Sequence, residues 1–170
     1  MNNVGVAKLI QRDFLMSAFA RFLFPENILL DVDAADKAQV FAHIAFAFRR
    51  EHKIDYSSVY EALLAREKLE STALGCGVAL PHAQISGLSA PMIGILRSRT
   101  PIAFDAPDGL PVSTIVVLLV PNKGSQEYLQ ILAEIADALC DEGFREKLGA
   151  AHDAHAAWQL MVRWGTSHVH

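Results

Sequence analysis

Two hydrophobic patterns alternate along the chain. Short continuous apolar runs near residues 28–32, 92–99 and 112–120 are typical of strands, and the run from Ile115 to Val120 contains only β-branched residues and leucines. Such a run predicts a strand covered on both faces, because a strand with one wet face would alternate apolar and polar residues. Between the runs, apolar residues recur at helical spacing. Strands interleaved with helices predict a three-layer α/β/α fold.

The helices are predicted from this spacing and from polar residues that can cap them. Asp33 is expected to cap a helix that continues to Phe48, and Ser58, with Glu61 three residues later, has the pattern of a capping box. Ser125 is expected to cap a third helix. That helix is predicted to face the core with Leu129, Leu132, Ala133 and Ala136, flanked by Ile131 and Ile135. Two further helices are predicted through Phe144 and Leu148, and through Trp158, Leu160 and Met161.

Composition and charge indicate a compact chain of one domain's length. The 170 residues are 52% apolar, and a net charge of −4 gives no support to nucleic acid or an anionic membrane as the main partner. No stretch is long enough to span a bilayer, and the apolar run before Arg21 is too short for a signal peptide. Cys76 and Cys140 lack metal-ligand spacing. We therefore expect reduced thiols, a cytoplasmic protein, and a Cys76 that packs rather than reacts.

Residues 66–84, REKLESTALGCGVALPHAQ, carry the candidate chemistry. The glycines at positions 75 and 77 are expected to end the preceding helix. The short apolar run after them is predicted to be a buried strand, which Pro81 ends, so that His82 lies at a strand end.

A neutral imidazole suits a nucleophile near pH 7, because one ring nitrogen keeps a free lone pair. Phosphoryl transfer to His82 would need cationic and hydroxyl groups around the phosphoryl oxygens, and Arg66, Ser71 and Thr72 lie nearby in the sequence. On the residues alone, an ordinary loop histidine beside a plain Ser71-Thr72 turn remains the alternative.

No metal or cofactor is predicted. His152 and His155 have the i, i+3 spacing of a possible metal site, but two such residues alone are weak evidence. His168 and His170 are expected to belong to a C-terminal tail.

The same stretch resembles the active-site signature of enzyme IIA of the mannitol, fructose and nitrogen-regulatory class in the phosphoenolpyruvate-dependent phosphotransferase system. That signature is written REK-x-x-ST-x-x-G-x-G-x-A-(I/L)-PHG. The similarity covers roughly residues 16 to 162, and the phrases LLAREKL and FDAPDG-x-PV are more like the nitrogen-regulatory branch. The matching positions are Arg66, Glu67, Lys68, Ser71, Thr72, Gly75, Gly77, Val78, Ala79, Leu80, Pro81 and His82.

The resemblance implies a mixed, roughly five-stranded sheet with helices on both sides. It places the domain at residues 16–163, after an N-terminal extension or misplaced start at 1–15 and before a tail at 164–170. In the family the histidine of the PH pair receives a phosphoryl group from an HPr-like carrier, which implies the same of His82. Arg66 would neutralise its charge, and Ser71 or Thr72 would donate hydrogen bonds. The implied targets are components such as potassium transporters or sensor kinases, and no cofactor is implied.

Three positions depart from the family pattern. Ala83 replaces the glycine after the PH pair, and Gln84 replaces the basic residue that commonly follows. The helix that begins E-H-L in the family reads Glu127-Tyr128-Leu129, so Tyr128 replaces the second active-site histidine. We expect Tyr128 to lie near the acceptor ring as a weaker hydrogen-bond donor, with simple packing against the sheet as the alternative.

These departures leave three functions open. The chain is expected to be a phosphohistidine carrier and regulator, or an interaction module with reduced or lost phosphotransfer, or a sugar-specific IIA that passes the group to a permease's IIB domain. A hydrolase or metalloenzyme is least favoured, because no second acid, base or ligand set accompanies His82. Because a protein donor must reach the ring, His82 is expected to open onto a shallow surface depression.

Overall fold

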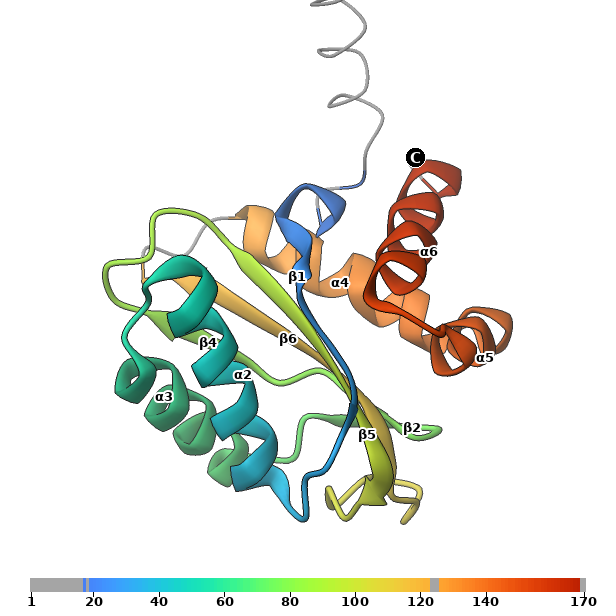
Figure 1. The fold of residues 1–170 in the computed structure, drawn as a ribbon, viewed down its shortest axis with the longest axis horizontal. Coiled ribbons are helices and arrows are strands. Elements are labelled where there is room, and N and C mark those ends of the chain that lie inside the picture. Colours follow the sequence, from blue (N-terminus) through green and yellow to red (C-terminus); the bar gives the residue numbers. More distant parts are fainter. Residues whose placement is uncertain (1–16, 18, 123–125, 169–170) are drawn as a thin grey trace, which may run out of the picture.

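Strand β6 (Val112–Pro121) is the centre of a six-stranded mixed sheet in the computed structural model, which describes residues 17, 19–122 and 126–168 (Figure 1). On one side β6 pairs antiparallel with β5 (Met92–Ile102), and β5 pairs parallel with β1 (Leu23–Val32). Residues 115–119 of β6 have no exposed surface. The prediction of a strand covered on both faces is therefore confirmed.

The other side of β6 is shared by two short strands. β3 (Val78–Ala79) pairs parallel with the start of β6, and β4 (His82–Ile85) pairs parallel with its end. β2 (Ala73–Gly75) then pairs antiparallel with β3 at the sheet edge. The sheet thus has one strand more than the roughly five expected, because the run before Pro81 and the segment after it pair separately with β6.

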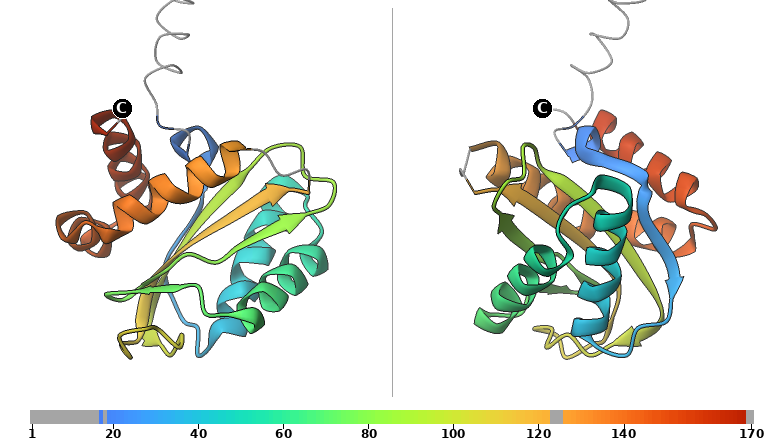
Figure 2. Two further views of the ribbon diagram at one scale, coloured as in Figure 1. Left: turned by 180° about the vertical axis from the view of Figure 1, so that it is seen from behind. Right: turned by 60° about the vertical axis from the view of Figure 1, so that its left-hand side comes forward.

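Helices cover both faces of the sheet, as Figures 1 and 2 show. The helices are α2 (Lys37–His52) and α3 (Tyr56–Leu69) on one face, and α4 (Gln126–Cys140), α5 (Glu142–Ala150) and α6 (Ala154–Ser167) on the other, with a short 3₁₀ helix, η1 (Phe19–Phe22), before β1. Alternate residues of β6 serve the two layers: Val116 and Leu118 pack with the α4–α6 core, and Val117 and Leu119 with the α2–α3 core. This is the predicted three-layer α/β/α arrangement.

Aspartates cap the helices, and two predicted caps are wrong. The carboxylates of Asp36, Asp55, Asp141 and Asp153 accept from the backbone N–H three residues later, at 2.7–2.9 Å. Asp36 therefore caps α2 in place of Asp33. Asp55 caps α3 in place of Ser58, which lies inside the first turn and donates both its N–H and its hydroxyl to that carboxylate. The predicted cap Ser125 lies outside the described residues.

Other expectations need smaller corrections. The buried stripe of α4 consists of Ile131, Ile135, Ala138 and Leu139, whereas Leu129 is 63% exposed. β1 begins at Leu23, earlier than expected, and accommodates Pro25 where its register with β5 shifts. α6 continues through Ser167, so residues 164–167 are helical. Within the described ranges, no helix combines the length and apolar character needed to cross a membrane.

Candidate active site

His82 is the first residue of β4, not the last residue of the strand before it. Leu80 and Pro81 lie between β3 and β4 and belong to neither strand, although the Leu118 amide of β6 donates to the Pro81 carbonyl at 3.0 Å. His82 then resumes the pairing opposite Leu118. The predicted strand end is corrected to a junction between two strands that share one partner, which fixes the backbone on both sides of the ring.

The ring of His82 is tied to its own backbone neighbour. Nδ1 lies 2.9 Å from the Leu80 carbonyl oxygen. Because a carbonyl oxygen can only accept, this contact requires the proton to be on Nδ1, and the neutral ring then carries its free lone pair on Nε2. His82 is half-buried, so the ring is not enclosed by the protein.

The surroundings favour the neutral form of this ring. Burial lowers the pKa of His82 below its ordinary value, and the nearby Arg66 charge lowers it further, while the hydrogen bond to Leu80 and the charge of Glu67 act in the opposite direction. The result is a neutral imidazole near pH 7, with one nitrogen available as a nucleophile.

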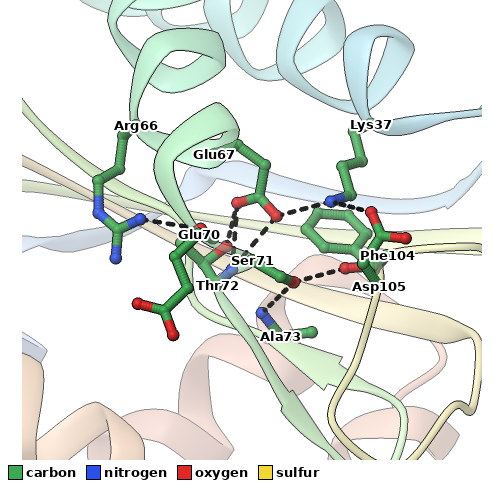
Figure 3. A network of polar contacts seen from close by, with 9 residues as sticks. All are labelled: Lys37, Arg66, Glu67, Glu70, Ser71, Thr72, Ala73, Phe104 and Asp105. Atoms are coloured by element: carbon green, nitrogen blue, oxygen red, sulfur yellow. Dashed lines mark hydrogen bonds and ion pairs between the residues drawn. The ribbon is translucent and has the colours of Figure 1, made fainter.

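Arg66 and Tyr128 lie near His82 on two different helices, Arg66 close enough for its charge to lower the pKa of the ring. Arg66 lies in the last turn of α3 and donates from Nη1 to the Glu70 carbonyl at 2.9 Å (Figure 3). Tyr128 lies in the first turn of α4, and its ring centroid is 6.3 Å from that of His82, with the planes tilted by 45°. Burial raises the pKa of Tyr128 while the Arg66 charge lowers it, with a net rise, so its hydroxyl stays protonated at neutral pH. The structure thus brings His82, Arg66 and Tyr128 together.

Ser71 and Thr72 are close to His82 in sequence, but their hydroxyl groups donate to other partners. The Ser71 hydroxyl donates to the Phe104 carbonyl at 2.5 Å, and the Thr72 hydroxyl donates to Glu67 Oε2 at 2.5 Å (Figure 3). A hydroxyl has a single proton to donate. In this arrangement neither residue is free to serve as the expected donor to a group on His82, and both instead fix the loop between α3 and β2.

Two charged residues beneath this loop had no predicted role. Glu67, only 8% exposed, accepts from the backbone N–H and the hydroxyl of Thr72 and from Lys37 Nζ at 2.9 Å (Figure 3). Lys37, at the start of α2, also bonds Asp105 at 2.9 Å. Burial lowers the pKa of Lys37, but the two carboxylates raise it by more, so the ammonium is retained. One signal could have revealed Glu67: it lies eight residues after Val59 and four after Leu63, on the buried stripe of α3.

The glycines of the signature form a turn, not a helix end. α3 ends at Leu69, and Gly75, Cys76 and Gly77 connect β2 to β3 with φ of 91°, 53° and 78°. Three left-handed residues in succession explain the paired glycines. Asp108 holds the turn by accepting from the Cys76 N–H at 2.7 Å. Cys76 is exposed, so the expectation that it packs is wrong.

The two departures after the PH pair are accommodated without strain. Ala83 is 9% exposed, belongs to the α2–α3 core, and does not have the left-handed backbone that would require glycine. Gln84 is exposed on β4. Both residues continue strand β4 directly after His82.

A cleft of about 620 Å³ lies beside this group of residues. It is lined by the β4–β5 turn (residues 86–89), by the end of β6, and by Glu127 and Tyr128 of α4. His82 itself is not part of the lining. Tyr128 lines this cleft and also lies beside the His82 ring. Within the described residues no group of three His, Cys, Asp or Glu side chains could hold a metal ion.

The fold and this histidine site define a protein of the enzyme IIA class. Enzyme IIA mannitol from Escherichia coli matches the fold with a TM-score of 0.68 at 22% identity, over 82% of this chain and 98% of that one. A closer match is the crystal structure of nitrogen regulatory protein IIA-Ntr from Neisseria meningitidis, with a TM-score of 0.80 at 36% identity over 85% of this chain and 99% of that one.

Sequence comparison assigns the family. The chain belongs to the family described as phosphoenolpyruvate-dependent sugar phosphotransferase system, EIIA 2, whose model matches residues 21–163. It is 38% identical to a nitrogen regulatory protein of Pseudomonas aeruginosa over 86% of this chain and 96% of the relative. It is also 38% identical to the fructose-specific EIIA component of a phosphotransferase system in Haloferax volcanii, over 64% of this chain and 70% of the relative. The predicted resemblance to the nitrogen-regulatory type of enzyme IIA is confirmed.

Proposed function

We propose that this protein is a phosphohistidine carrier and regulator of a phosphoenolpyruvate-dependent phosphotransferase system, and that Nε2 of His82 accepts the phosphoryl group from an HPr-like protein. The observation that carries the proposal is the 2.9 Å contact between His82 Nδ1 and the Leu80 carbonyl, because it leaves Nε2 as the nitrogen with a free lone pair.

The transfer can be written with these groups. The Nε2 lone pair of His82 attacks the phosphorus of the donor's phosphohistidine, a new N–P bond forms, and the old N–P bond breaks with its electron pair returning to the donor's nitrogen. His82 keeps its Nδ1 proton, which the Leu80 carbonyl accepts throughout. The arriving group carries up to about two negative charges. Arg66 supplies the nearby cation, and Tyr128 supplies a neutral donor in the place of the family's second histidine.

The regulatory role rests on similarity to nitrogen regulatory proteins. In this role the phosphorylation state of His82 would control binding to target proteins, for example components of potassium transport or sensor kinases. A sugar-specific role is the second candidate, favoured by the similarity to a fructose-specific EIIA component. An interaction module without phosphotransfer is the third, favoured by Tyr128 in the position of a histidine.

Intact mass after incubation with phosphoenolpyruvate, enzyme I and the HPr-like carrier tests the proposal. The expected result is a gain of one phosphoryl group in the wild type and none in His82→Gln. Arg66→Ala should raise the activation barrier to transfer by about 3 kcal/mol, and so slow it, while leaving the fold intact. A wild type that gains no mass would support the interaction module. Onward transfer to the IIB domain of a sugar permease would support the sugar-specific role.

A further inference from the structure

We propose that Lys37 and Glu67 are positioning residues that act on His82 through Thr72 and Leu80, holding the ring in the tautomer that leaves Nε2 unprotonated. The proposal rests on the proposed function, since it concerns the nitrogen that would accept the phosphoryl group. Neither Lys37 nor Glu67 is assigned a direct contact with that group.

The first step joins Lys37 to the loop before β2. Lys37 Nζ donates to Glu67 Oε1 at 2.9 Å, and the Glu67 carboxylate accepts from the Thr72 backbone N–H at 3.2 and 3.3 Å and from the Thr72 hydroxyl at 2.5 Å. Both Glu67 and Thr72 are buried, at 8% and 5% exposure. Figure 3 shows the Glu67 carboxylate between Thr72 and the Lys37 ammonium. Because one buried carboxylate accepts from both the N–H and the hydroxyl of Thr72, it fixes both the backbone and the side chain of that residue.

The second step joins Thr72 to the histidine. The Thr72 carbonyl accepts from the Leu80 N–H at 3.0 Å, and the Leu80 carbonyl accepts from His82 Nδ1 at 2.9 Å. The Leu80 peptide groups are thus held on one side by Thr72 and used on the other to hold the ring. A displacement of Thr72 would displace the carbonyl that fixes the tautomer of His82.

The third step explains why a charged pair is needed. A buried carboxylate without a cation would be strongly unfavourable, and Lys37 provides the cation at 21% side-chain exposure, with its ammonium 5.0 Å from the centroid of the Phe104 ring. Asp105, on the outer side of Lys37, is 85% exposed and so weakly coupled. The Lys37–Glu67 pair is therefore the inner part of this network, and it holds the loop between α3 and β2, to which the Leu80 N–H is hydrogen-bonded through the Thr72 carbonyl.

The test reads the tautomer directly, without phosphorylation. Long-range ¹H–¹⁵N NMR at about pH 8, where imidazoles are neutral, distinguishes a protonated from an unprotonated ring nitrogen, and His82→Gln assigns the His82 signals. The wild type should be protonated at Nδ1. Glu67→Gln and Thr72→Val should shift His82 toward a mixture of tautomers and lower the rate of phosphoryl transfer by about tenfold to a hundredfold, the range expected from misplacing a reacting group.

Four further variants separate positioning from folding. Thr72→Ser keeps the hydroxyl and should keep the wild-type tautomer and rate, even if Glu67→Gln fails to fold. Lys37→Arg should retain more activity than Lys37→Met, because only the first keeps a cation beside Glu67. Lys147→Met, on α5 in the opposite helical layer, is the matched control and should change neither readout.

Two results would overturn the proposal. One is a wild-type tautomer and rate in Glu67→Gln and Thr72→Val. The other is a slower rate with an unchanged tautomer, which would assign Glu67 to stability alone. If wild-type protein gains no phosphoryl group, the proposed function fails, while the tautomer measurement still decides whether Lys37 and Glu67 position the ring.

Discussion

Single substitutions of Tyr128 should change the phosphorylation of His82 in either direction. Its ring lies 6.3 Å from that of His82, it is half-buried, and the Arg66 charge acts on both residues. We expect Tyr128→Phe to weaken phosphorylation of His82 and Tyr128→His to strengthen it. Phenylalanine keeps the aromatic body and removes only the hydroxyl donor, whereas histidine can supply a charged donor.

The expected magnitudes follow from the type of hydrogen bond. A bond to a charged group contributes about 1.5–3 kcal/mol, and the lower end applies to a half-buried site, so losing the phenol donor should cost about tenfold in the extent of transfer. An imidazolium at a partly exposed site adds about 1 kcal/mol, which is roughly fivefold. The Arg66 charge opposes protonation of a histidine at position 128. The gain from Tyr128→His should therefore grow as the pH falls below the ordinary pKa of histidine.

The assay is the equilibrium between the phosphorylated HPr-like carrier and this protein, together with the initial rate, for wild type, Tyr128→Phe and Tyr128→His. Thermal unfolding of each variant checks that the packing of α4 is preserved. Identical rates and equilibria in all three proteins would refute the reasoning and would leave Tyr128 as a residue that only packs beside the ring.

Three other predictions concern pH and stability. Because the pKa of His82 is lowered, the folded state binds fewer protons than the unfolded chain: the ring should titrate by NMR with a midpoint below 6.5, and its contribution to stability, present above pH 6.5, should be lost as the pH falls. Arg97→Met should lower the free energy of unfolding by about 2–3 kcal/mol in denaturant titrations, because the Arg97 side chain is only 12% exposed and its guanidinium donates to three carbonyls at the end of α5. Arg99 lies on the same strand with a side chain that is 64% exposed, so Arg99→Met should change the free energy of unfolding by less than about 0.5 kcal/mol. Gly165→Ala would place a Cβ 2.0 Å from the Ser17 hydroxyl oxygen and should lower the free energy of unfolding by about 1–3 kcal/mol. Ser17→Gly should restore most of this loss. If Gly165→Ala lowers the free energy of unfolding equally in the Ser17→Gly background, the contact with Ser17 is not the cause.

The layered fold could be predicted because its signals are local. The unbroken apolar run of β6, the helical spacing before and after it, and the proline between β3 and β4 each lie within a few residues. The helix caps are harder to predict. The segment from Asp31 to Asp36 contains three aspartates, and the path of the chain after β1 decides which one reaches the N-terminus of α2. Propensity alone does not distinguish them.

In the candidate site, too, the sequence predicts which residues gather but not how their hydrogen bonds are directed. His82, Arg66 and Tyr128 could be predicted to gather because the family signature contains the first two and the family's E-H-L helix start aligns with Tyr128. The directions of the Ser71 and Thr72 hydroxyls could not, since their partners are set by the loop at Phe104 and by the burial of Glu67. Lys37 is 30 residues from Glu67, and nothing in its local sequence indicates that the start of α2 meets the end of α3.

Charge balance connects the buried pair to the proposed regulation. Glu67 lies close enough to His82 to influence its pKa, so an uncompensated Glu67 would oppose a phosphoryl dianion on that ring. Lys37 neutralises Glu67, and the Arg66 charge, which already acts on His82, can then face the phosphoryl group. Arg66 offsets only part of up to about two added negative charges. On the proposed function, phosphorylation therefore makes the surface beside Tyr128 more negative, and a partner protein that binds this surface would discriminate between the two states by charge.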